Sequence, residues 1–325
     1  MNIRNRIVII MVVSLFAVSA KAAPMAYSVN SDGEPGDALY LIDLATGADM
    51  YRGRLDAGIE FRSDTEGLAF SPGPESRLWG IDEPSATMFP ISTLNGSIDY
   101  REDIPLPPLP SGPDNDSIGG SDFGMTFTCD GTVFFTSVKS QSLFRRGLDG
   151  SITNVGSVGA LGANISALAA TGIPTKLYGL GNGQFSDGSK DSPNLYRIDV
   201  NTGIATVIGP ISATDEFKYN EAGLAFDADG GLWAITDRSQ INSQKSQILN
   251  IDVASGAATL VSETVNETGY ESLAIGPPNC GVESSADDAF PKIPTLSTAG
   301  LLSTILVLML AGMAILRRRH TPDNS

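Results

Sequence analysis

Two hairpin patterns recur along the chain between residues 24 and 280. The first has a strand of five or six residues in which apolar and polar positions alternate, a turn that ends in glycine, and a second short strand. Glycine supplies the positive φ that such a turn needs, so the pattern predicts a β-hairpin. NLYRIDVNTGIATVIG and QILNIDVASGAATLVS are its two best copies. The five copies of this hairpin lie at 38–53, 87–102, 142–157, 194–209 and 247–262.

A second hairpin pattern precedes the first. It consists of a strand of small and apolar residues, a turn with glycine or proline, and a strand with an aromatic residue. The complete copies lie at 66–82, 123–137, 166–181 and 221–237. Their aromatic residues, which we expect to pack between neighbouring units, are Trp79, Phe134, Tyr178 and Trp233. The fifth copy is split, because 270–280 supplies its first strand and 25–30 supplies its second.

Two hairpins per unit give four antiparallel strands, repeated about every 50 residues, which is typical of β-propeller blades. We therefore predict an all-β fold, a β-propeller of five four-stranded blades over residues 24–280. N-terminal and C-terminal strands would share one blade and close the ring, which leaves no sheet edge open. A β-sandwich built from the same hairpins is the alternative fold.

Acidic residues recur beside the predicted inner strands, at positions that a propeller brings to one rim of its central channel. Three glutamates precede inner strands, one aspartate lies close to the same register, and two aspartates end second strands. These six residues are Glu66, Glu221, Glu271, Asp122, Asp82 and Asp237. Converging carboxylates repel one another unless a cation joins them, and Ca²⁺ accepts six to eight oxygen ligands in flexible geometry. The sequence thus suggests a calcium site, with backbone hydrogen bonding between blades as the alternative role of these acids.

The only histidine is His320, near the C-terminus. The predicted propeller therefore lacks histidine-based catalytic triads and histidine metal sites. Glu66-Gly67-Leu68 resembles the segment in which metal-dependent hydrolases of the gluconolactonase-like family place a glutamate before an inner strand. The absences favour a non-enzymatic binding or structural protein, and the resemblance leaves a Ca²⁺-dependent propeller hydrolase, acting on a lactone or phosphoester, as the alternative.

The net charge of the chain narrows the classes of binding partner. The chain of 325 residues has a net charge of −16. Because several of its basic residues lie at the two termini, the predicted propeller is more acidic than the chain as a whole. This argues against binding to nucleic acid, which requires a basic surface, and against an anionic membrane surface.

Cys129 and Cys280 belong to no CxxC motif. In an exported protein they predict one disulfide, with two separate thiols as the alternative.

Residues 1–23 have the layout of a secretory signal peptide. Arg4 and Arg6 precede an apolar run, 7–18, and small residues follow up to Ala22 and Ala23, where we expect cleavage. An uncleaved membrane anchor is the alternative. Both interpretations send the body out of the cytoplasm.

The C-terminal segment, 293–320, carries the most specific motif. It begins with Ile293-Pro294-Thr295-Leu296, continues through Gly300 and the uncharged stretch 297–316, and ends with Arg317, Arg318 and Arg319. The stretch is long enough to form a transmembrane helix, and the arginines would keep residues 321–325 in the cytoplasm. This segment resembles the IPTL-CTERM sorting signal of Gram-negative bacteria, although Ala299 stands where that family usually has tryptophan.

That resemblance implies a route. The precursor would be held in the inner membrane by its tail, beyond a linker at 281–292. An exosortase-type transpeptidase would then remove the helix and direct the body to the cell surface or extracellular matrix. A plain C-terminal anchor is the alternative. At the surface, the propeller would bind a glycan, another surface protein or a cation.

Overall fold

The computed structural model describes residues 23–281, apart from 32–35, 57, 59–60, 113–120, 185–187, 215 and 242. Nearly all of the predicted signal peptide and the whole predicted sorting signal, with its helix at 297–316, lie outside these residues. Within the described part of the chain, no helix is long and apolar enough to cross a membrane. The described residues belong to one compact unit, which ends at Gly281.

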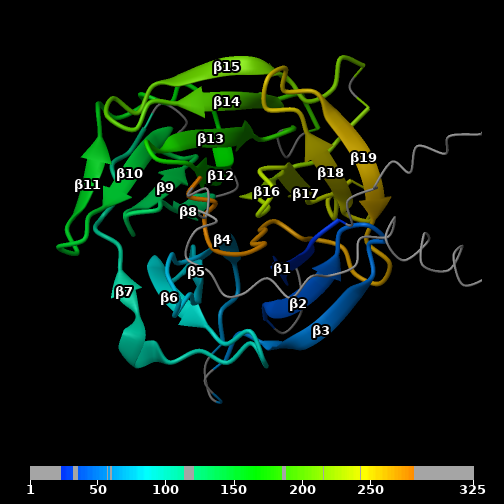
Figure 1. Cartoon of the computed structure of the whole chain (residues 1–325), viewed down its shortest axis with the longest axis horizontal. Helices are drawn as coiled ribbons and strands as arrows, with labels where there is room; N and C mark the ends of the chain where they lie inside the picture. Colours follow the sequence, from blue (N-terminus) through cyan, green and yellow to red (C-terminus); the bar gives the residue numbers. More distant parts are fainter. Residues whose placement is uncertain are drawn as a thin grey trace, which may run out of the picture. The chain divides into compact units, whose positions relative to one another are not determined.

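The described strands form five antiparallel sheets arranged around a centre (Figure 1). Blade 1 contains β1 (Met25–Asn30), β2 (Ala38–Asp43) and β3 (Asp49–Arg54). Blade 2 contains β4 (Thr65–Phe70), β5 (Leu78–Asp82), β6 (Thr87–Ile91) and β7 (Ile104–Pro105). Blade 3 contains β8 (Met125–Phe127), β9 (Val133–Ser137), β10 (Ser142–Arg146) and β11 (Ile152–Val155). Blade 4 contains β12 (Ile165–Thr171), β13 (Lys176–Gly181), β14 (Asn194–Ile198) and β15 (Ala205–Pro210). Blade 5 contains β16 (Ala222–Phe226), β17 (Leu232–Thr236), β18 (Gln247–Ile251) and β19 (Ala258–Glu263).

The ring is closed by the two ends of the propeller, as the sequence predicts. Residues 270–274 supply the inner strand of blade 1 through isolated antiparallel bridges that join Tyr27 to Ala274 and Asn30 to Tyr270. The Tyr27 N–H donates to the Ala274 carbonyl oxygen at 2.7 Å, and the Ala274 N–H donates back at 2.9 Å. The prediction of a five-bladed propeller with four-stranded blades is therefore confirmed.

One predicted hairpin has different bounds. The pattern at 87–102 places the outer strand of blade 2 directly after the turn, but residues Tyr100–Glu102 form a 3₁₀ turn, η1. Asp99 is extended there, and its side chain accepts a hydrogen bond from the backbone N–H of Arg101. That cap starts a turn where the pattern predicts a strand. The outer strand, β7, therefore follows later and pairs with Thr87 and Met88.

Aromatic side chains join successive blades. Three second-strand aromatics contact the inner-strand phenylalanine of the next blade: Tyr27 with Phe70, Trp79 with Phe127, and Tyr178 with Phe226. Their ring centroids lie 5.8, 6.2 and 5.5 Å apart, respectively. Such pairs stabilise a core by about 0.5–1.5 kcal/mol beyond the burial of their surface. The core therefore lies between blades, where the sequence predicts that these aromatics pack.

Candidate functional site: an acidic cluster at the channel mouth

Three predicted ligands meet at one mouth of the channel. Glu66 lies in β4, while Asp122 and Glu221 precede β8 and β16. One carboxylate oxygen from each lies within 4.8 Å of the other two. Glu66 and Asp122 are buried, with 5% and 4% of their surfaces exposed. Three non-adjacent segments of sequence, from three blades, thus converge on one point.

Glycines in the inner strands make this convergence possible. A Cβ atom on Gly223 would lie 2.2 Å from the carbonyl carbon of Ser272, and one on Gly67 would lie 2.8 Å from the Cβ of Met125. Both distances are far below van der Waals contact, so only glycine allows the neighbouring inner strands to approach this closely. The acids at these strand ends are drawn together as a result.

Burial and mutual repulsion raise the pKa of two of the three carboxyl groups. For Glu66, loss of hydration is the largest cause, followed by the charges of Asp122 and Glu221. The pKa of Glu221 is raised by loss of hydration first, then by Asp122 and Glu271. In both cases the charged form is disfavoured. A bound divalent cation would reverse this, because its charge favours the ionised carboxylates around it.

Two of the glutamates also make hydrogen bonds within the protein, Glu66 to the neighbouring blade and Glu271 within blade 1. Glu66 Oε2 accepts a hydrogen bond from the backbone N–H of Phe123, at the start of blade 3. Glu271 Oε2 accepts one from the Ser31 hydroxyl, just after β1. The structural role that the sequence left open is therefore present. Glu66 can still take part in another contact, because its hydrogen bond to Phe123 uses one of its two carboxylate oxygens.

The two aspartates that end second strands lie outside the cluster of Glu66, Asp122 and Glu221. Asp82 accepts hydrogen bonds from the backbone N–H groups of Ser63, Asp64 and Ser85, at 3.0–3.3 Å. Asp237 Oδ1 accepts one from the N–H of Ser239 at 2.8 Å. These carboxylates therefore hold the backbone of nearby loops. Glu271 is likewise outside the three-residue cluster, although its charge acts on Glu221.

A buried arginine that the sequence did not single out explains the environment of Asp82. Arg62 is 5% exposed and lies between the rings of Phe89 and Tyr100, with its guanidinium carbon 4.4 and 4.8 Å from their centroids. Its Nη1 lies 3.8 Å from Asp82 Oδ2, and its Nη2 donates to Asp103 Oδ2 at 2.5 Å. Arg62 therefore supplies Asp82 with a positive charge from the protein itself.

Sequence reasoning also missed two acids beside Glu66. Oxygen atoms of Asp64, Glu66 and Glu83 lie within 4.8 Å of one another. Glu83 Oε1 in addition accepts a hydrogen bond from the Ser121 N–H at 2.5 Å. Asp64 lies two residues before Glu66, but the ladder register shifts between Thr65 and Gly67, so strand alternation alone did not predict that these two carboxylates meet.

A small cavity lies directly behind the acids. Its volume is about 10 Å³, the room of a single water molecule, and its lining includes Glu66, Ser166 and Ser272. The Ser166 hydroxyl is buried and has no hydrogen-bond partner among the described residues. A buried hydroxyl without a partner is costly unless a ligand or water satisfies it. The lining of the cavity therefore includes one carboxylate, from Glu66, and one neutral hydroxyl, from Ser166, and Ca²⁺ accepts both kinds of oxygen.

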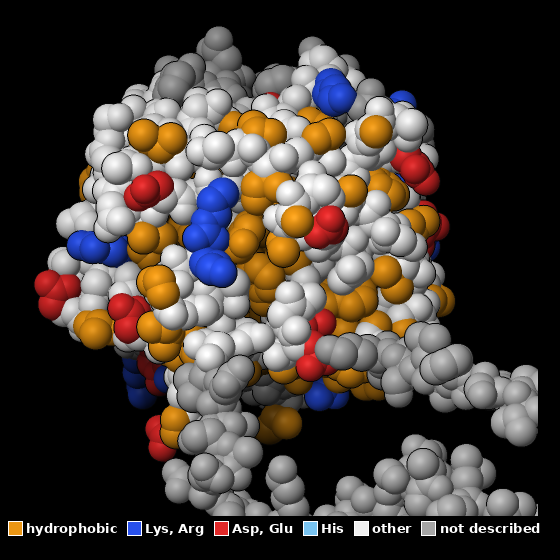
Figure 2. All heavy atoms as spheres, turned by 45° about the horizontal axis from the view of Figure 1, so that its top comes forward, with side chains coloured by type: hydrophobic (Ala, Val, Ile, Leu, Met, Phe, Trp, Pro, Cys, Tyr) orange, Lys and Arg blue, Asp and Glu red, His pale blue; other side chains and the backbone are white. Residues whose placement is uncertain are grey.

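Acidic residues are not massed on every surface of the body. On the face in Figure 2, acidic side chains stand singly among neutral and hydrophobic ones. On that face the acidic side chains thus form no patch, whereas the carboxylates at the channel mouth are gathered within a few ångströms. Solubility explains acidic side chains that stand singly on a surface, but it does not explain carboxylates that are gathered at the channel mouth.

Comparisons with known proteins gave structural neighbours only. No protein-family model matches the chain, and no curated protein matches it. Among solved structures, virginiamycin B lyase from Staphylococcus aureus is similar at 17% identity and a TM-score of 0.39, over 77% of this chain and 73% of that one. A gluconolactonase from Xanthomonas campestris is similar at 14% identity and a TM-score of 0.42, over 76% and 78%. A putative 6-phosphogluconolactonase from Bacteroides uniformis gives 12% identity and 0.41, over 74% and 83%.

Proposed function

We propose that this propeller is an exported binding protein that holds one Ca²⁺ ion at the acidic mouth of its channel. The observation that carries the proposal is the convergence of Glu66, Asp122 and Glu221 within 4.8 Å. Two of these carboxyls are held in a state that disfavours their charge until a cation arrives. The buried Ser166 hydroxyl and ordered waters would complete an oxygen shell.

The bound ion gives the propeller a means to recognise surface ligands. A Ca²⁺ ion held by few protein oxygens keeps water-filled positions, which hydroxyl or carboxylate groups of a glycan or surface protein can take. Export and tail-directed sorting belong to the same proposal, supported by the signal-peptide layout at 1–23 and the motif at 293–320. Both would send the propeller out of the cytoplasm, where calcium is abundant.

Calorimetric titration of the purified body, residues 24–281, with CaCl₂ tests the site. We expect one ion per molecule with micromolar affinity and a higher melting temperature. The matched pair of variants is Glu221→Gln, which should abolish binding, and Glu216→Gln, an exposed glutamate on the loop before β16, which should leave it intact. Binding that survives Glu66→Gln, Asp122→Asn and Glu221→Gln equally would reject the site.

A Ca²⁺-dependent hydrolase is the second candidate function, and the convergence of Glu66, Asp122 and Glu221 favours it. A cation held by these carboxylates would polarise a lactone carbonyl or a phosphoester oxygen. Turnover of lactones and phosphoesters by the calcium-loaded body measures this. Turnover abolished by Glu66→Gln or Glu221→Gln and by chelation would establish an enzyme, and its absence across the panel would leave the binding protein.

The sorting tail is tested separately in cells. Replacement of Pro294 and Thr295 by alanine should leave the precursor in the membrane fraction, whereas the unchanged chain should release a shorter body to the surface. A plain anchor would instead keep both proteins in the membrane at full length.

A further inference from the structure

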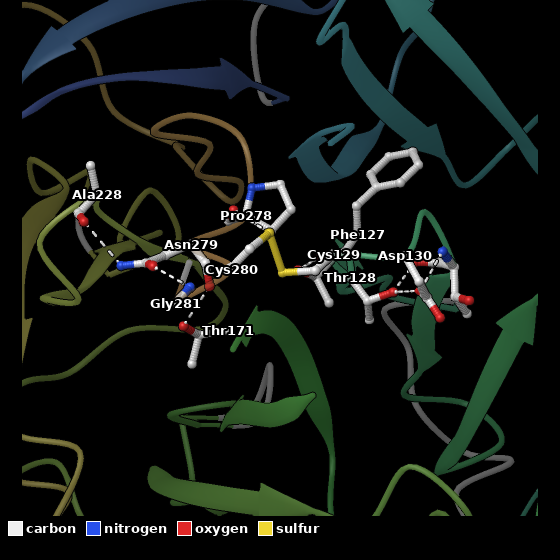
Figure 3. Close-up of a disulfide and its surroundings, with 12 residues drawn as sticks. Phe127, Thr128, Cys129, Asp130, Thr171, Ala228, Pro278, Asn279, Cys280 and Gly281 are labelled. Atoms are coloured by element: carbon white, nitrogen blue, oxygen red, sulfur yellow. Dashed lines mark hydrogen bonds between the residues drawn. A yellow bond between two sulfur atoms is a disulfide. The ribbon is translucent and has the colours of Figure 1, made fainter. Parts of the chain in front are cut away.

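The chain does not end at the inner strand of blade 1. After residues 270–274, the segment Gly276–Gly281, which we name the strap, runs across the rim of the channel opposite the acids. It follows the inner strand of blade 1, and Figure 3 shows Asn279 directed at Ala228 and Thr171 on one side and Cys280 bonded to Cys129 on the other. Gly276 and Pro278 line the channel at this end, together with Phe70, Phe127 and Phe226 from the inner strands.

Two successive strap residues contact three other blades. The Asn279 carbonyl oxygen accepts hydrogen bonds from the Gly172 N–H at 2.8 Å and from the Thr171 hydroxyl at 3.0 Å, both in blade 4. Its side-chain Nδ2 donates to the Ala228 carbonyl oxygen of blade 5 at 3.0 Å. The next residue, Cys280, forms a disulfide with Cys129 of blade 3, which confirms the predicted bridge. The strap therefore ties four of the five blades together.

The strand that precedes the strap is the least regular inner strand of the ring. β4, β12 and β16 pair with their second strands through ladders of five or six residue pairs, with a register shift in β4 and in β12, and β8 pairs through three. Residues 270–274 pair with β1 only through two isolated bridges. Few ladder hydrogen bonds hold this strand, so local opening should begin there. The strap lies immediately beyond it and holds its far end to three other blades.

We propose that the strap is a redox-controlled latch, and that reduction of Cys129–Cys280 releases it and opens the channel at the rim opposite the acids. Both cysteines are partly exposed, so a reductant can reach them. An external dithiol would supply two electrons and two protons, become a disulfide itself, and leave Cys129 and Cys280 as thiols. The hydrogen bonds of Asn279 to blades 4 and 5 then remain, and the closing strand loses its covalent anchor to blade 3.

The opened end would expose a cavity that the strap now covers. Its volume is about 30 Å³, and it is lined by the lower ends of all five inner strands, three of which contribute phenylalanine rings. In the oxidised protein, Gly276 and Pro278 of the strap form part of the lining at this end of the channel. In the reduced protein, the channel would become accessible from both ends, with an apolar second mouth.

Hydrogen–deuterium exchange with mass spectrometry tests the latch on the full chain. We expect reduction by dithiothreitol to speed exchange about tenfold or more in peptides that cover Met25–Asn30 and 270–281. Exchange in β14, Asn194–Ile198, should stay unchanged, because blade 4 keeps its complete ladder. The double variant Cys129→Ser/Cys280→Ser should show the same pattern without reductant.

Two controls separate a latch from general loosening. The same dithiothreitol treatment of the double serine variant should cause no further change, because no disulfide remains to be reduced. Asn279→Ala with the disulfide intact should raise exchange in the strap alone. Equal acceleration in all five blades, or none anywhere after complete reduction, would overturn the proposal. If the double variant does not fold, reduction of the native, folded protein gives the same decision.

Discussion

Single carboxyl groups in this protein are placed where their charge is costly. Glu66, Glu221 and Asp37 each have a raised pKa, and burial is the largest cause for all three. A buried carboxylate without a cation destabilises the folded state, because its ionised form loses hydration. The propeller therefore carries a local free-energy cost at the acidic mouth, which removal of a charge or addition of a cation should relieve.

Replacement of Glu221 tests that cost directly. Glu221→Gln keeps the shape of the side chain and removes its charge, so we expect the chelator-treated variant to be more stable than wild type by about 1–2 kcal/mol. Calcium should raise the melting temperature of wild type but not of the variant. Thermal unfolding with and without chelator measures both effects. A variant less stable than wild type under chelator would show that the charge is already compensated within the protein.

Asp37 should make stability depend on pH. Burial, opposed by hydrogen bonding from Thr65, raises its pKa to about 7 in the folded protein. An unfolded aspartate has a pKa of about 3.9, so the folded state binds more protons between these two values. Stability contributed by this group therefore falls as pH rises from about 4 to about 7. Its backbone partner, the Thr65 N–H, lies 2.7 Å from Oδ2.

The variant Asp37→Asn keeps an acceptor oxygen for Thr65 but cannot titrate. We expect its free energy of unfolding to fall less than that of wild type between pH 5 and pH 8. The difference between the two proteins should be on the order of 1–3 kcal/mol at pH 8. Denaturant unfolding at several pH values measures the slope. Parallel curves for the two proteins would mean that Asp37 has the same pKa folded and unfolded.

At the scale of elements, the packing of inner strands depends on the absence of side chains. Gly223 in β16 faces the backbone of Ser272, and its missing Cβ leaves room for the closing strand. Gly223→Ala should destabilise the protein by about 1–3 kcal/mol, since the neighbour is backbone and cannot rotate away. Gly276→Ala is the matched control, because a Cβ there meets nothing within 4 Å. Equal melting temperatures for the two variants would contradict this account of the strand contact.

The elements show what the sequence could and could not predict. Alternation and glycine turns placed the hairpins well, because a turn with positive φ leaves a recognisable residue. They misplaced the outer strand of blade 2, where the Asp99 cap starts η1 before β7 begins. They also missed Arg62, Asp64 and Glu83, because these residues contribute to the site through contacts between loops that strand periodicity does not encode. The three-residue cluster was within reach of prediction, since a repeat places equivalent positions at equivalent points of a ring.

On the scale of the whole molecule, closure combines a noncovalent strand with a covalent bridge. Cys129 and Cys280 are separated by 151 residues, so the disulfide restricts a large part of the unfolded chain. In the chain-entropy model a loop of this length corresponds to about 5 kcal/mol. We expect Cys129→Ser/Cys280→Ser to lower the free energy of unfolding by an amount of that order. Urea unfolding of the variant measures it, and a loss below about 1 kcal/mol would contradict a stabilising role for the bridge.

The pairing of these cysteines illustrates the limit of prediction at this scale. The sequence favoured a single disulfide, because the chain has two cysteines and is predicted to be exported. The distance between the two cysteines, however, depends on how the ring closes. The Cα atoms lie 5.5 Å apart because the strap crosses from blade 1 to blade 3. No residue pattern predicts that crossing. Gly276–Gly281 has no strand periodicity, and it has no turn signature that would fix the direction in which the segment runs.

The position of the bridge also decides how the molecule would respond to pulling. If the body is tethered through its C-terminal end, tension enters at Gly281, one residue beyond Cys280. A covalent path then passes the load to blade 3 before it reaches residues 270–274, whose two isolated bridges to β1 would otherwise be unzipped one after another. Under such a tether, the oxidised propeller would resist unravelling from the end that is held.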